Sequence, residues 1–108
     1  MAYVVWVPQL GAEEKHVRGA TRLASDGRAR HFWDPKEQLG RSYARVLFNV
    51  EKPVLWDFYM LFARSAKWNA SQLPVPDLWM HQLNALGPTH HLDAAEFAAE
   101  AQKLLDTR

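Results

Sequence analysis

Apolar side chains along this chain fall into continuous runs and into helical stripes. Residues 3–8 and 54–62 are unbroken runs of apolar, β-branched and aromatic side chains in which Asp57 is the only charge. Runs of this kind are typical of strands that are covered on both faces. A short strand is also expected over residues 30–33, and an edge strand over residues 66–69. The pattern therefore predicts four strands.

The clearest helical signature lies after the second predicted strand. Asp34 is a favourable N-cap residue, Pro35 suits the first helical position, and Glu37 stands where a capping box needs an acid. The apolar side chains that follow recur at helical spacing, at positions Leu39, Tyr43, Val46 and Leu47. These features predict a helix with one buried face.

Three further helices are expected. One follows Gly11 and ends near residues 25–27, and a second covers residues 77–86, where Gly87 follows. The last starts at Asp93, with Glu96 at the capping-box position. Its predicted buried stripe is Phe97, Ala101, Leu104 and Leu105.

Composition limits the class of protein. The chain has 108 residues, of which 48% are hydrophobic and 23% charged, as expected for a single domain over residues 1–108. The formal charge of +1 is scattered, so no basic stripe indicates a nucleic-acid partner. No apolar run approaches the roughly 20 residues that span a bilayer. Met1 and Ala2 lead straight into a strand, so we expect no signal peptide. The absence of cysteine fits a cytoplasmic protein.

The order strand, helix, strand, helix, strand, hairpin strand, helix resembles the thioredoxin fold over residues 3–105. The resemblance is to the thiol-disulfide oxidoreductase and peroxiredoxin branch. The stretch from Trp33 to Tyr43 looks like a strand, aspartate and helix of that branch. Pro53 stands near the place of the family's cis-proline, and residues 58–68 look like its terminal hairpin. The resemblance implies an α/β fold, with a small mixed sheet of about four strands flanked by helices.

Two alignments with that family are open. In one, residues 3–7 precede the redox helix, and residues 10–13 stand where Cys-x-x-Cys would be. In the other, which we favour, the same strand follows the redox helix, and the family's first strand and catalytic helix are missing. The expected strand order is the same in both, namely 30–33, 3–8, 54–62, 66–69. The chain has no cysteine, and attack on a disulfide requires a thiolate, so thiol redox catalysis is excluded.

Four residues form the candidate ligand pocket, namely Trp79, Met80, His81 and Asp57. A methionine and an aromatic ring make adaptable apolar walls, and a histidine beside them adds a polar group. Asp57 within an apolar run is either a general acid or base, or a structural carboxylate that accepts hydrogen bonds. The pattern favours the structural role.

The histidines raise the question of a metal. His90 and His91 are adjacent, and His81 precedes them by nine residues. Zinc sites prefer four ligands at recognisable spacings, and this chain has neither cysteine nor an H-x-x-x-H pattern. We therefore expect no metal and no cofactor.

These observations favour a redox-inactive thioredoxin-like protein that acts by binding. If a strand and a helix of the family are missing, apolar faces of the sheet are left open, and a homodimer is the commonest way to cover them. We expect Tyr3, Trp6 or Trp79 near the centre of that interface. The alternative is a small-molecule binder, or a non-thiol enzyme, that uses the neighbourhoods of Asp57 and His81. A protein partner or a small ligand fits either hypothesis.

Overall fold

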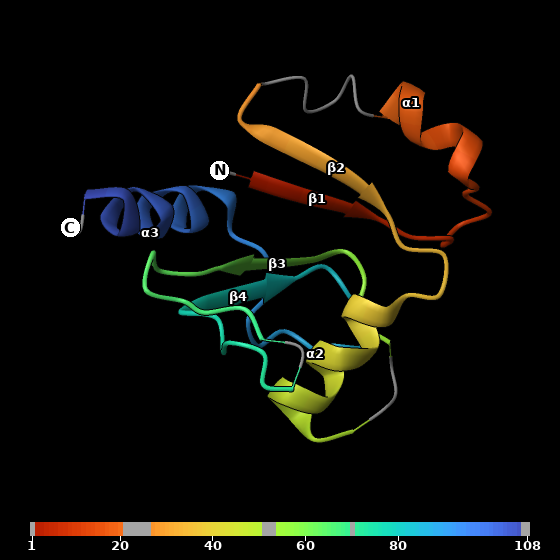
Figure 1. Cartoon of the computed structure of the whole chain (residues 1–108). Coiled ribbons are helices and arrows are strands. Elements are labelled where there is room, and N and C mark those ends of the chain that lie inside the picture. The colour runs from red at the N-terminus through yellow and green to blue at the C-terminus, as the bar shows by residue number, and fades with distance from the viewer. Residues whose placement is uncertain (1, 21–26, 51–53, 70, 107–108) are drawn as a thin grey trace.

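The computed structural model describes residues 2–20, 27–50, 54–69 and 71–106. Over these residues the chain forms a small α/β fold with two sheets of two strands each (Figure 1). Its two longer helices are α2 (Gln38–Phe48) and α3 (Ala94–Asp106). Among the described residues, no helix has the length and apolar character needed to span a bilayer.

The first sheet pairs the strands near the N-terminus. β1 (Ala2–Trp6) and β2 (Ala29–Trp33) run parallel, with Val4 opposite His31. The side chains of the two strands also interact, because Trp6 Nε1 donates a hydrogen bond of 3.0 Å to His31 Nδ1. The predicted pairing of the first two strands is confirmed.

The connection between these strands begins with helical structure. A 3₁₀ turn, η1 (Glu14–His16), continues into the short helix α1 (Val17–Ala20). Glu13 and His16 form a reciprocal capping box at the start of this segment. Most of the predicted helix end at residues 25–27 lies outside the described residues.

The predicted helix after Asp34 is confirmed as α2, although it begins later than expected, at Gln38. The Asp34 carboxylate accepts hydrogen bonds from the N–H groups of Gln38 at 3.1 Å and Leu39 at 3.0 Å, as a cap does. Glu37 does not complete a capping box. It has a left-handed backbone with φ of 53°, and its carboxylate accepts a hydrogen bond from the Gln9 side chain.

The second sheet begins with β3 (Phe58–Leu61), which is shorter than the predicted strand over residues 54–62. The cause is Asp57, which lies before the strand instead of inside it. Its φ of 50° places it in the left-handed region and interrupts the extended backbone. Pro53, in the place of the family's cis-proline, lies outside the described residues.

The partner of β3 is β4 (Leu78–His81), in antiparallel register with Met60 opposite Trp79. The prediction of a helix over residues 77–86 is therefore wrong for its first half. Only a 3₁₀ turn, η3 (Asn84–Leu86), is helical in this region. Pairing with β3 stabilises the extended form of a four-residue segment that shows no helical period of its own.

The predicted edge strand over residues 66–69 is also wrong. Asn69 makes an isolated bridge to Gln72, and no longer ladder is formed by this segment. The Trp68 ring packs edge-on against Phe62, with ring centroids 4.8 Å apart. The bulky residues here therefore cover the side of the fold rather than extend the sheet.

The predicted single four-stranded sheet is not formed by the described residues. No ladder joins β1 to β3, and the strands make two separate sheets. The ladders of β1 and β3 face β2 and β4, respectively. β1 and β3 thus each keep one edge without a strand partner in the described part of the chain.

The core lies between α2 and the second sheet. Tyr43, Ala44 and Leu55 are buried, and apolar side chains of β3 pack against them. The Tyr43 hydroxyl donates a hydrogen bond of 2.9 Å to the Pro74 carbonyl oxygen. Gly40 lets α2 approach closely, because a Cβ at this position would overlap the Leu55 carbonyl oxygen.

α3 contacts the second sheet through Phe97, whose ring lies 6.2 Å from that of Tyr59 in an edge-on arrangement. The helix and its N-cap are confirmed, since Asp93 Oδ1 accepts a hydrogen bond of 3.0 Å from the Glu96 N–H. The predicted stripe is only half-buried. Leu105 is 58% exposed and does not belong to it.

Candidate functional site

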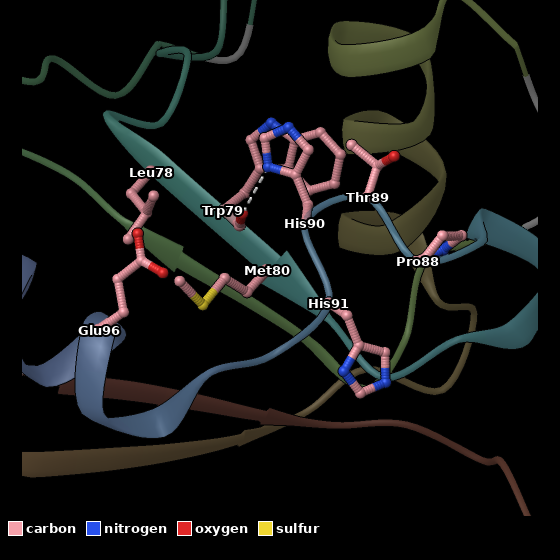
Figure 2. A pocket seen from close by; sticks show the side chains of 8 residues that line it. All are labelled: Leu78, Trp79, Met80, Pro88, Thr89, His90, His91 and Glu96. Carbon is pink, nitrogen blue, oxygen red and sulfur yellow. Dashed lines mark hydrogen bonds between the residues drawn. The ribbon is translucent and has the colours of Figure 1, made fainter.

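An open hollow of about 350 Å³ lies where β4, the segment 88–91 and the first turn of α3 meet (Figure 2). Its walls combine apolar, imidazole and carboxylate groups, among them Trp79, Met80, His90, His91 and Glu96. Two of the four predicted pocket residues, Trp79 and Met80, therefore line it. His81 and Asp57 do not.

His81 is fully buried next to the hollow, and both of its ring nitrogens are occupied. Nδ1 accepts a hydrogen bond of 2.9 Å from the Leu83 N–H, and Nε2 lies 2.7 Å from the Thr89 carbonyl oxygen. A nitrogen that accepts an N–H carries no proton, so Nε2 is the ring nitrogen that donates to the Thr89 carbonyl oxygen. His81 therefore ties the end of β4 to the segment that forms the hollow.

The main chain of His81 supports the same segment. Its N–H donates to the His90 carbonyl oxygen at 2.9 Å, and its own carbonyl oxygen accepts from the Leu92 N–H at 2.8 Å. These bonds place residues 90–92 along the outer edge of β4. The hollow is thus built on a hydrogen-bonded framework.

His90 covers the Trp79 ring. The two rings stack with centroids 3.6 Å apart and planes inclined by 5°, and His90 Nδ1 lies 3.0 Å from the Trp79 carbonyl oxygen (Figure 2). The Phe58 ring also stacks with Trp79, at 5.3 Å. These contacts fix Trp79 and make it a rigid wall.

Met80 positions the start of α3. It is 4% exposed, and its sulfur accepts a hydrogen bond of 3.4 Å from the Asp93 N–H. The Asp93 carboxylate in turn caps the helix, which places Glu96 at the rim of the hollow (Figure 2). The Glu96 carboxylate and the imidazoles of His90 and His91 therefore line the hollow together with apolar side chains of β4.

Asp57 belongs to a separate polar cluster. The Tyr59 hydroxyl donates a hydrogen bond of 2.7 Å to Asp57 Oδ1 and lies 3.1 Å from Gln82 Oε1. Burial, together with this hydrogen bond and the negative charge of Asp57, raises the pKa of Tyr59 to about 12. The tyrosine therefore stays protonated at neutral pH. This favours the structural role of Asp57 over an acid or base role.

The arrangement of ionisable groups limits the chemistry of the described residues. No group of three or more histidine, aspartate or glutamate side chains among them is placed to hold a metal ion. His90 and His91 are neighbours in sequence, but His90 stacks on Trp79, and the His91 ring lies edge-on to that of His81 at 5.8 Å.

A second surface lies on the first sheet. Tyr3 is 65% exposed and Phe32 is 50% exposed, and their ring centroids are 6.1 Å apart. We call these two residues the aromatic patch. Trp6 is half-buried and hydrogen-bonded to His31, and Trp79 is held in its ring stack. Of the three aromatic residues expected at an interface, Tyr3, Trp6 and Trp79, Tyr3 is thus the one with an exposed side chain.

Comparison of the chain with protein-family models, with curated proteins and with solved structures gives no match.

Sequence reasoning missed several residues of these sites. The stacking of His90 on Trp79 depends on the return of the segment 88–91 along β4, which the helical interpretation of residues 77–86 does not predict. The Tyr59–Asp57 bond lies at the bend at Asp57, which the interpretation of residues 54–62 as one strand does not predict. The sequence predicts a strand at Phe32 but not the exposure of its side chain. The alternation of Arg30 and Phe32 with half-buried neighbours on β2 is a period of two that indicates one open face.

Proposed function

We propose that this chain is a redox-inactive thioredoxin-like protein that acts by binding and works as a homodimer. The absence of cysteine leaves it without a thiol for disulfide exchange. Location in the cytoplasm is part of the same proposal, because a chain without cysteine is suited to a reducing compartment.

The exposed area of the chain is the observation that carries the homodimer. The chain exposes 8089 Å². A compact monomer of 12.4 kDa is expected to expose about 6,100 Å². The excess of about 2,000 Å² is larger than the roughly 800 Å² that each partner buries in a standard interface. Association with a second copy over a standard interface would remove part of this excess.

The aromatic patch is the feature best suited to such an interface. Tyr3 and Phe32 are large, and they contact each other from neighbouring strands. Aromatic residues are enriched at interfaces and contribute a large share of the binding free energy. Neither residue belongs to the buried core.

Paired lysine substitutions test the patch. The double variant Tyr3→Lys, Phe32→Lys should weaken dimerisation at least tenfold, because charges replace the contact area. Val75→Lys is the matched control, since Val75 is 67% exposed but lies outside the patch. Sedimentation velocity over a dilution series measures the dissociation constants. Equal constants for the double variant and the control would contradict the role of the patch.

A second candidate function is small-molecule binding at the hollow, in keeping with its volume and its mixed lining. A thermal-shift screen tests it, because a ligand that binds the native state raises the melting temperature by mass action. A shift from one chemical class that is lost in His91→Ala and kept in His16→Ala would support binding there. Shifts that are equal in both variants would contradict it.

A further inference from the structure

The outer edge of β1 presents main-chain groups without partners in the described part of the chain. The Ala2 N–H donates to the Arg28 carbonyl oxygen at 2.9 Å, and the Trp6 carbonyl oxygen accepts from the Asp34 N–H at 2.8 Å. In a parallel ladder, alternate residues point toward the partner strand. The main-chain N–H and C=O groups of residues 2, 4 and 6 therefore face β2. The N–H and C=O groups of Tyr3 and Val5 face away from it.

This edge has the composition of an inner strand. β1 contains no charged residue and no proline, whereas natural edge strands are usually protected by charges, prolines or bulges. The outer edge of β4 is different, because the segment that contains His90 and Leu92 already pairs with it. The free edge of β3 is also uncharged, but all four of its residues are half-buried, whereas β1 begins with two exposed residues, Ala2 and Tyr3, before three half-buried ones.

We propose that a second copy of this chain occupies the β1 edge, with the two β1 strands antiparallel and Val4 on the two-fold axis. In this register, the N–H and C=O of Tyr3 bond to those of Val5 in the second copy, and the reverse bonds follow by symmetry. Every outward-facing group of Tyr3 and Val5 is then used. The β1–β2 sheets of the two copies then form one four-stranded sheet. The inference rests on the proposed homodimer and places β1 in its interface, with Tyr3 of the aromatic patch in the strand pair and Phe32 on the neighbouring strand β2.

The side chains fit the same register. Tyr3 lies opposite Val5 of the second copy, which makes a stabilising pair of an aromatic and a β-branched residue on one face. Val4 lies opposite its own copy on the other face. No charged residue is present in either strand, so no like charges meet. Other registers of β1 on itself leave part of the Tyr3 and Val5 groups unpaired.

Single cysteine substitutions test the register directly, because the chain itself has no cysteine. The two Val4 residues form a non-hydrogen-bonded antiparallel pair, whose Cα atoms lie about 4.5 Å apart, within the range of a disulfide. Val4→Cys should therefore form a covalent dimer under mild oxidation. Tyr3→Cys is the matched control, since position 3 is more exposed but is offset from its own copy. Val75→Cys reports cross-linking by random collision.

The expected result is cross-linking of Val4→Cys at least about tenfold faster than that of both controls. Equal rates for Val4→Cys and Tyr3→Cys would overturn the register. A dimeric wild-type chain in which Val4→Cys does not cross-link would overturn the β1 interface and leave the homodimer standing. A wild-type chain that is monomeric at all concentrations would overturn both.

Discussion

Replacement of His81 by leucine is the sharpest test of how the hollow is built. His81 has no exposed surface, and its two ring nitrogens bond to the main chain at Leu83 and Thr89. Leucine fills much of the same space but has no polar atom. His81→Leu therefore removes both hydrogen bonds without opening a large cavity.

The expected cost follows from the partners that remain. The Leu83 N–H becomes a buried donor without an acceptor, which costs about 1–3 kcal/mol. The Thr89 carbonyl oxygen loses a bond worth about 1 kcal/mol, although Thr89 is exposed and water replaces part of it. We expect the free energy of unfolding to fall by about 2–3 kcal/mol, which lowers the melting temperature by about 10 °C or more in a domain of this size.

Urea denaturation followed by tryptophan fluorescence measures the change, with the slope of the transition as a check that the unfolded state is the same. His91→Leu is the control, because His91 is exposed and its ring makes no side-chain hydrogen bond to the described residues. The control should stay within about 0.5 kcal/mol of the wild type. A similarly small change for His81→Leu would refute the structural role of His81.

Two further predictions concern the core and the tyrosines. Gly40→Ala should lower the free energy of unfolding by about 1–3 kcal/mol in thermal melts, because its Cβ would overlap the Leu55 carbonyl oxygen. Gly19→Ala has open space around its Cβ and should raise the free energy of unfolding by a few tenths to about 1 kcal/mol. Equal effects of the two variants would contradict the close approach of α2. The pKa values of Tyr59 and Tyr43 are raised to about 12, so stability is retained below pH 10 and falls as the pH rises from 10 through 12. Absorbance titration at high pH should show these two tyrosines ionising late, with one late group lost in Tyr59→Phe, and ionisation of all tyrosines near pH 10 would contradict both environments.

Local signals in the sequence were sufficient where neighbouring residues decide the structure. The Asp34 and Asp93 caps lie at the starts of α2 and α3, since a cap needs only the first helical turn. The parallel pairing of residues 3–8 with residues 30–33 followed from two runs joined by a helical segment. These parts of the fold were predictable.

Long-range pairing decided the rest. Residues 78–81 carry no strand alternation, and Gly87 after them is typical of a helix end, so the strand depends on β3 for its partner. Asp57 in a left-handed conformation could not be read from an apolar run, and its bond to Tyr59 followed from that bend. The candidate hollow therefore held Trp79 and Met80 as predicted, while His81 became a structural support.

The mass of the wild-type chain in solution tests the central claim most directly. Sedimentation equilibrium from low micromolar to near-millimolar concentration should give a molecular mass of about 25 kDa at the highest concentration, twice the 12.4 kDa of one chain. This mass should decrease on dilution. A mass of 12.4 kDa over the whole range would contradict the account, because the excess exposed surface would then have no second copy to cover it.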